Sequence, residues 1–302
     1  MVENDSTRRM SKQLNPAQVR IVCISDLHSL QLPSGLPPGD ILIVAGDLTE
    51  GRPSYLLSRL EELQGLKSQF PFIFIIGGNH DRALDEKCDS HDAAIYNDMA
   101  ERVQCREAFR TASGINYLEN NGVEIYLNKR TIKVWGSPGS LATTQRTCFG
   151  YTAGKDAQDL WAQIPADTNI LITHGPPLGY MDRDGLGCEN LRKALWRIKP
   201  FAHVFGHVHE GHGSLVLRYD QAQKEYEAAV SDWKVITEKQ TSGNLGTYIP
   251  RHLHSAKRPP FPRLPERREV MEEGLLDNQQ ETLLVNASIK SVPPFDPVVI
   301  QI

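Results

Sequence analysis

Five short fragments of this sequence combine carboxylates, imidazoles and one amide in arrangements that suit metal ions. In chain order they are Asp26-Leu-His28, Gly46-Asp47, Gly78-Asn79-His80-Asp81, His174-Gly175 and Gly206-His207-Val-His209. Oxygen and imidazole ligands without a thiolate are typical of Mn²⁺, Fe or Zn²⁺ held with open coordination positions, and they argue against a closed structural zinc site. The seven potential ligands exceed what one ion needs. They suit a pair of ions, an arrangement used for displacement at phosphorus.

Each fragment follows a short apolar run that is predicted to be a buried strand. The runs cover residues 20–25, 41–45, 72–76, 169–173 and 201–205. Ligands of open α/β sheets bind at the carboxyl ends of the strands, where all five fragments fall. A single fragment is better explained as a turn or a hydrogen-bonded core histidine. The metal centre is indicated because five such fragments occur, each at the end of a predicted strand. Glycines before Asp47, Asn79 and His207 are expected to let the backbone bend tightly.

Segments with helical patterns separate several of these strands. Helices are predicted at residues 53–63, 91–109, 155–163 and 190–198, and further strands at 124–127, 131–135, 214–219, 282–285 and 297–302. Strands separated by helices, followed by strands alone, favour a layered α/β protein with a mixed sheet or a pair of sheets. We expect a flexible leader at residues 1–18 and one domain over residues 19–302.

Residues 237–269 differ in composition from the rest of the chain. They are rich in proline and arginine and show no apolar period. This composition predicts a disordered insertion within the domain. A lid or a loop that docks a partner is the alternative, because the basic residues could attract an anionic surface.

Bulk properties limit the classes of function. The chain has 302 residues and a net charge of -4, which gives no reason to expect nucleic acid as an obligatory partner. No apolar run approaches the ~20 residues that span a bilayer, and the polar start lacks a signal-peptide core. The five cysteines are odd in number and widely spaced, so neither a disulfide framework nor a structural zinc site is expected. We expect Cys23 to be a core residue and the protein to be cytoplasmic, in a reducing compartment.

Taken together, the five fragments resemble the pattern of the calcineurin-like metallophosphoesterase superfamily: D-x-H, G-D, G-N-H-[DE], G-H or H-G, and G-H-x-H. Residues 171–179, 203–211 and 285–288 resemble one branch in particular, the metallophosphoesterase-domain-containing (fetal-brain 239-like) proteins, which are also found widely in fungi. The resemblance runs from about Val19 onward and is interrupted by the insertion.

The resemblance implies an αββα sandwich, in which two packed mixed β-sheets are flanked by helices and a dinuclear metal site lies at the carboxyl ends of the strands. It favours Mn²⁺, with Fe, Zn²⁺ or Mg²⁺ as alternatives. The implied ligands are Asp26, His28 and His209 for the first metal, Asn79, His174 and His207 for the second, and Asp47 for both.

The resemblance also implies a reaction, the hydrolysis of a small phosphoester by a hydroxide between the metals. His80 would stabilise the transition state or protonate the leaving oxygen. Asp81 would orient an imidazole or simply cap the following turn. A phosphodiester or cyclic nucleotide is the expected substrate by analogy with the branch. A phosphomonoesterase, a nuclease and a metal-binding scaffold for protein partners are the alternatives, and no membrane partner is expected.

Some residues bear on which subgroup of the superfamily this chain resembles and on whether it is active. Protein phosphatases of the superfamily have G-D-x-x-D-R-G, whereas residues 46–52 read Gly-Asp-Leu-Thr-Glu-Gly-Arg. The missing second aspartate argues against a protein phosphatase. His209 completes the ligand set, which argues against an inactive scaffold. His203, in mid-strand, is predicted to be a hydrogen-bonded core histidine, and His212 a loop residue.

Overall fold

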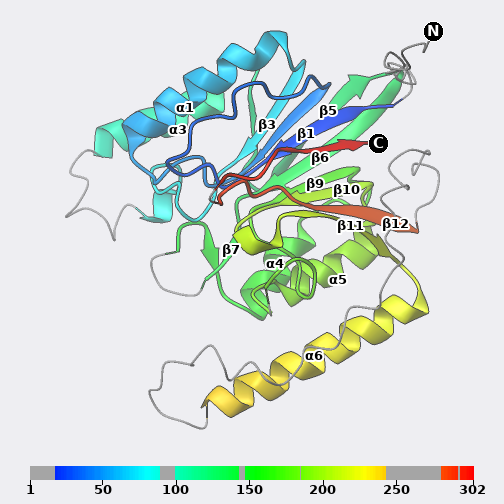
Figure 1. The fold of residues 1–302 in the computed structure, drawn as a ribbon. Coiled ribbons are helices and arrows are strands. Elements are labelled where there is room, and N and C mark those ends of the chain that lie inside the picture. Colours follow the sequence, from blue (N-terminus) through cyan, green and yellow to red (C-terminus); the bar gives the residue numbers. More distant parts are fainter. Residues whose placement is uncertain (1–17, 89–98, 143–146, 184, 243–279, 292) are drawn as a thin grey trace, which may run out of the picture.

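The computed structural model describes residues 18–88, 99–142, 147–183, 185–242, 280–291 and 293–302. The predicted leader therefore lies outside the described residues except for Gln18, as does most of the predicted insertion. The described chain forms two mixed sheets that face each other, with helices on both outer sides (Figure 1). The predicted αββα sandwich is confirmed.

One sheet has five strands in the order β13-β1-β2-β3-β4. Their bounds are β1 (Arg20–Ile24), β2 (Ile41–Ala45), β3 (Phe72–Ile76), β4 (Asn116–Tyr117) and β13 (Val298–Gln301). All pairs are parallel except β1 with β13. All five residues of β2 are buried, because both faces of this sheet are covered.

The other sheet has six strands in the order β11-β12-β10-β9-β6-β5. Their bounds are β5 (Asn121–Leu127), β6 (Arg130–Ser137), β9 (Ile170–Thr173), β10 (Ala202–Phe205), β11 (Gly213–Arg218) and β12 (Glu281–Asn286). The four central strands are parallel, and β11 and β5 run antiparallel at the edges. A separate short pair joins β7 (Ser140–Leu141) to β8 (Gly150–Tyr151).

Helices cover the outer face of each sheet. α1 (Pro53–Gly65) and α3 (Met99–Thr111) lie against the five-stranded sheet, and α4 (Lys155–Ala162) and α5 (Glu189–Ile198) lie against the six-stranded one (Figure 1). α1 buries Leu56, Leu60 and Leu63, which lie at helical spacing on one face. Three short 3-10 helices, η1 (Leu66–Ser68), η2 (Glu86–Cys88) and η3 (His209–Gly211), occupy connecting segments.

α6 (Gln221–Ser242) is the main element that the sequence analysis did not predict. Its buried apolar residues, Tyr226 and Val230, pack with α5 and the segment after β9. The helix includes residues 237–242, so the prediction of a disordered insertion is wrong for these six residues, and residues 243–279 lie outside the described part. Among the described helices, none is both long and apolar enough to cross a membrane.

Cys88 and Cys148 form a disulfide, which contradicts the expectation of no disulfide framework for this pair. The two cysteines are 60 residues apart, so no local spacing in the sequence predicted the bond. Asp85 brings their segments together, since its carboxylate accepts hydrogen bonds from the backbone N–H groups of Phe149, at 2.6 Å, and Lys87, at 2.9 Å. The other three cysteines are free and buried, and Cys23 is the core residue that was predicted.

His203 is the buried core histidine predicted for β10. The Thr173 hydroxyl donates to the Gly175 carbonyl at 2.8 Å, so the His203 Nε2–H donates to the same hydroxyl oxygen at 2.8 Å. His203 Nδ1 has no hydrogen-bond partner among the described residues. Burial lowers the pKa of His203 from 6.5 to about 3, so the folded chain keeps this imidazole neutral.

The neutral His203 predicts a loss of stability in acid. Between pH 6.5 and about 3 the unfolded chain binds a proton at this residue that the folded chain does not, so the free energy of unfolding falls as the pH falls. His203→Gln keeps a side-chain donor but cannot titrate there. Urea unfolding at pH 7 and pH 5 should show a smaller fall for this variant, by up to about 1.4 kcal/mol per pH unit. Equal falls in both proteins would contradict the assignment.

Candidate metal centre

Five parallel strands deliver the candidate ligands to one edge of the sandwich. β1, β2 and β3 end two, two and three residues before Asp26, Asp47 and Asn79, respectively. In the facing sheet, His174 directly follows β9, and His207 follows β10 after one glycine. The carboxyl ends of the two sheets therefore face each other, and both contribute side chains to a single cluster.

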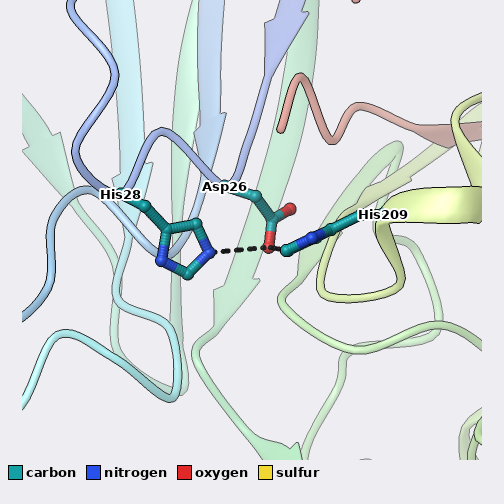
Figure 2. Close-up of side chains that lie close together, drawn as sticks. All are labelled: Asp26, His28 and His209. Carbon is teal, nitrogen blue, oxygen red and sulfur yellow. Dashed lines mark ion pairs between the residues drawn. The ribbon is translucent and has the colours of Figure 1, made fainter. Parts of the chain in front are cut away.

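Asp26, His28 and His209 form the first group of candidate ligands, with ligand atoms within 4.8 Å of one another. Asp26 Oδ1 lies 3.9 Å from His28 Nε2 and 3.3 Å from His209 Nε2. Figure 2 shows the two imidazoles reaching the same carboxylate oxygen from opposite sides. His28 comes from the loop after β1 and His209 from η3, so this group joins segments far apart in the chain.

Asn79, His174 and His207 form the second group. The Asn79 amide oxygen lies 2.9 Å from His174 Nε2 and 2.7 Å from His207 Nδ1. His174 Nδ1 lies 2.9 Å from the Ala45 carbonyl oxygen, to which it can only donate. Its Nε2 is therefore the nitrogen that faces the cluster.

Asp47 lies between the two groups. Its Oδ2 is 3.4 Å from His28 Nε2 in the first group and 3.4 Å from His174 Nε2 in the second. Its Oδ1 accepts a hydrogen bond from the His80 backbone N–H at 2.8 Å. One carboxylate oxygen thus contacts an imidazole of each group, which is the position that a ligand shared by two ions requires.

Charge in the cluster is concentrated on buried groups. Burial by itself raises the pKa of the Asp47 carboxyl, but His174 and His28 outweigh it and hold the pKa below its ordinary value. Burial lowers the pKa of His174, yet Asp47 and Asp26 raise it to about 9. Burial, followed by the charge on His174, lowers the pKa of His207 to about 4. Burial also raises the pKa of the Asp26 carboxyl, but His209 and His174 outweigh it and hold the pKa below its ordinary value. Both buried carboxylates therefore remain anionic and attract positive charge.

The sequence profile of the calcineurin-like phosphoesterases matches residues 19–211, which is more than half of the chain and includes all five fragments. The chain belongs to this family. The resemblance identified from the fragments is thereby confirmed.

Relatives of this calcineurin-like phosphoesterase come from several organisms. A protein of Emericella nidulans named probable rhamnogalacturonate lyase C is 36% identical over 231 residues, which cover 75% of this chain and 20% of that one. Metallophosphoesterase domain-containing protein 1 of Homo sapiens is 34% identical, with 66% of this chain and 63% of that one covered. A UPF0046 protein of Caenorhabditis elegans is 31% identical, with 68% and 74% covered. The chain thus spans less than two thirds of the length of the first two relatives.

Four of the seven candidate ligands in this calcineurin-like phosphoesterase have left-handed backbone conformations. The φ angles are 56° at Asp26, 48° at His28, 51° at Asp47 and 67° at His207. Such residues cost about 1–3 kcal/mol each and gather at functional sites, although aspartate and histidine tolerate the conformation better than most. In each case the chain turns sharply after the strand, which lets the side chain reach the cluster.

The glycines beside the ligands act mainly by providing space. Only Gly46, with φ 94°, uses a conformation that favours glycine. A Cβ on Gly78 would lie 2.3 Å from Asp47 Oδ1, and one on Gly206 would lie 2.3 Å from Asp26 Oδ2. The expected tight bends before Asn79 and His207 are therefore better described as close approaches, between neighbouring loops of one sheet at Gly78 and between the two sheets at Gly206.

The two residues proposed for catalysis differ in setting. The His80 side chain is 41% exposed, and its ring lies 4.7 Å from the His28 ring. Asp81 is fully buried and accepts backbone hydrogen bonds from Leu48 at 3.1 Å, Thr49 at 3.1 Å and Gly78 at 2.9 Å. These hydrogen bonds join the loop after β2 to the loop after β3, and the described acceptor contacts of Asp81 are with backbone N–H groups rather than with an imidazole.

Glu50 and Lys290 reach the cluster without having been assigned a role from the sequence. Glu50 Oε1 lies 3.2 Å from His28 Nδ1 and Oε2 lies 3.4 Å from His80 Nδ1. Lys290 Nζ lies 3.7 Å from Glu50 Oε1. The position of Glu50 three residues after Asp47 was the only available signal, whereas Lys290 follows β12 and no local pattern tied it to the site.

Proposed function

We propose that the chain is a metal-dependent hydrolase of phosphoesters that binds two divalent cations. The observation that carries the proposal is the position of Asp47 Oδ2, equally distant from an imidazole of each ligand group. The proposed ligands are Asp26, His28 and His209 for one ion, Asn79, His174 and His207 for the other, and Asp47 for both. Family membership supports phosphoester hydrolysis in general.

The side chains present fit such ions. The buried Nε2 of His28 has no hydrogen-bond partner among the described residues, although it faces two carboxylates. Asp26 and Asp47 form ion pairs with histidines, and neither carboxylate pairs with a lysine or arginine of the described residues. Two buried anions that pair with no lysine or arginine among the described residues, next to an imidazole nitrogen without a hydrogen-bond partner, fit the ligand set of a pair of metal ions. When bound, the ions would act as Lewis acids on the phosphoryl oxygens and lower the pKa of an attacking water.

The chain's own residues position the reaction. The His80 backbone is fixed by its bond to Asp47 Oδ1, while its ring remains 41% exposed, open to a substrate. We propose that His80 donates a proton to the leaving oxygen. Asp81 holds the two loops that carry Asp47 and Asn79 and is a positioning residue.

The decisive experiment is an assay panel with Mn²⁺, Zn²⁺ or Mg²⁺ against mono- and diesters and 2′,3′- and 3′,5′-cyclic nucleotides. We expect hydrolysis that chelation abolishes and that added metal restores, with metal content measured in parallel. Activity that persists after both ions are removed would contradict the proposal. Among substrates we propose a phosphodiester or cyclic nucleotide, and among metals Mn²⁺. A phosphomonoesterase would instead hydrolyse the monoesters faster than the diesters and cyclic nucleotides.

His80→Ala tests the proton-donor role. We expect kcat to fall by about 10²–10³-fold on an alkyl phosphoester, whose leaving group needs the proton, and by less than about 10-fold on a p-nitrophenyl ester. Metal content should stay at the wild-type value because His80 is not a proposed ligand. An equal loss on both substrates would show that His80 acts in some other way.

The remaining assignments are proposals of the same kind. We propose one domain over residues 19–302 and a cytoplasmic location. The disulfide between Cys88 and Cys148 is unusual for a reducing compartment, so the redox state of this pair in cells tests the location. A protein confined to an oxidising compartment would contradict it.

A further inference from the structure

We infer that Glu50 is a positioning residue that holds the imidazoles of His28 and His80 through their Nδ1 atoms, presenting one Nε2 to a metal ion and the other to the substrate. The inference rests on the proposed function, because it assigns roles to the two Nε2 atoms. It adds a residue that neither the sequence pattern nor the ligand set includes.

The two oxygens of one carboxylate serve the two rings. Glu50 Oε1 lies 3.2 Å from His28 Nδ1, and Oε2 lies 3.4 Å from His80 Nδ1. The ring centroids are 4.7 Å apart and the ring planes are inclined at 75°, so both rings fit beside the one carboxylate that their Nδ1 atoms approach. Glu50 therefore couples the orientation of a proposed ligand to that of the proposed proton donor.

The need for a partner is clearest at His28. The residue is 2% exposed, and neither ring nitrogen has a hydrogen-bond partner in the described part of the chain. Nε2 faces Asp26 and Asp47, so Nδ1 must carry the proton when Nε2 binds a metal. Glu50 Oε1 is at ion-pair distance from that Nδ1, and a side chain that is 47% exposed has the freedom to turn and complete the hydrogen bond.

His174 shows the same arrangement with a different acceptor. Its Nδ1 donates to the Ala45 backbone carbonyl at 2.9 Å, leaving Nε2 toward the cluster. Histidine ligands of metals generally donate their second nitrogen to a carboxylate or carbonyl, which fixes the tautomer and raises ligand basicity. One proposed metal thus has an imidazole fixed by the main chain, and the other has an imidazole fixed by a replaceable side chain.

Lys290 explains why Glu50 orients histidines rather than binding a cation itself. Glu50, His28 and His80 could geometrically hold an ion, since their ligand atoms lie within 4.8 Å of one another. The Lys290 ammonium already lies 3.7 Å from Glu50 Oε1. Its positive charge disfavours a further cation at this carboxylate.

Glu50→Ala and Glu50→Gln in the full chain test the inference, with Glu62→Ala as the matched control. Glu62 is a similarly exposed acid that pairs with Arg59 on α1, away from the cluster. In the metal-free protein, ¹⁵N NMR of the imidazoles should show the Nδ1–H tautomer at His28 in the wild type and in Glu62→Ala. Glu50→Ala should lose this preference, and Glu50→Gln, whose amide has one acceptor oxygen, should keep at most one of the two contacts.

Metal titration and kinetics give the second readout. Calorimetry with Mn²⁺ should show affinity about 10–100-fold weaker at one site in Glu50→Ala and unchanged affinity at the other. With metal at saturation, kcat should fall more on an alkyl ester than on a p-nitrophenyl ester, while KM changes little. Circular dichroism verifies folding, and Glu50→Gln, nearly identical in size, serves if the alanine variant is unstable.

Wild-type tautomers together with wild-type affinity at both sites in Glu50→Ala would overturn the inference. That outcome is distinct from failure of the proposed function, which would appear as a wild-type protein without metal-dependent hydrolysis. The NMR readout reports on Glu50 in either case, because it requires neither metal nor substrate.

Discussion

Asp47→Asn should lower kcat/KM by about 10³-fold or more, equivalent to about 4 kcal/mol of transition-state stabilisation. The substitution removes the charged oxygen that lies 3.4 Å from His28 Nε2 and 3.4 Å from His174 Nε2. Because this oxygen is the proposed contact to both ions, one substitution should weaken both sites together. Kinetics at saturating Mn²⁺ and measurement of bound metal per chain would check the two parts of this expectation.

Asparagine is the informative replacement because of the backbone at this position. Asp47 has φ 51°, a conformation that asparagine tolerates and that alanine adopts only with strain. Asparagine also keeps an oxygen for the His80 backbone N–H, so loss of charge is separated from loss of loop geometry. Asp40→Asn is the matched control, since Asp40 accepts the Arg20 N–H at 2.7 Å, just before β2 and at its opposite end. Loss of only one ion from Asp47→Asn would contradict the shared position.

Asp81→Ala should produce the largest loss of stability of any substitution near the site. It leaves the N–H groups of Leu48, Thr49 and Gly78 without their acceptor. Each buried donor left unpaired costs about 1–3 kcal/mol, so the free energy of unfolding should fall by at least about 3 kcal/mol. Urea unfolding of the metal-free protein measures this loss without the added contribution of bound ions.

Asp81→Asn separates the acceptor from the charge. Its amide oxygen can accept from some of the three N–H groups, whereas its amide nitrogen faces a donor, so an intermediate loss is expected. Both variants should also lower activity, because the affected N–H groups belong to the loops that carry Asp47 and Asn79. A loss below about 1 kcal/mol for Asp81→Ala would show that water or a shifted loop replaces the carboxylate.

The fold and the proposed ligands could be predicted from the sequence because their signals are local. Short β-branched runs such as residues 41–45 have few alternatives to a buried strand, and each ends beside a polar fragment. Once five such ends are known, the topology of parallel strands brings them to one edge. The same reasoning placed His203 in the core, where it is buried with a hydroxyl partner.

The features that escaped prediction depend on contacts between distant segments. α6 packs through Tyr226 and Val230, but its apolar pattern is weak beyond the first turns. The disulfide joins cysteines 60 residues apart through loops that Asp85 brings together. Glu50 was visible in the sequence only as a residue in a turn. Its significance comes from the positions of two histidines on other segments, which no local spacing encodes.

The place of β12 in the sheet has a consequence for how this chain is made. β12 begins at Glu281, yet it lies between β10 and β11 (Figure 1). Its side chains belong to both the inter-sheet core and the outer core. All the proposed ligands precede it, the last being His209. During synthesis on the ribosome, every proposed ligand is therefore made before β12. The six-stranded sheet, whose strands β9 and β10 position His174 and His207, is completed only afterwards. During that interval the β10 edge lacks its partner strand, and an unpaired strand edge is a site at which chains can pair wrongly.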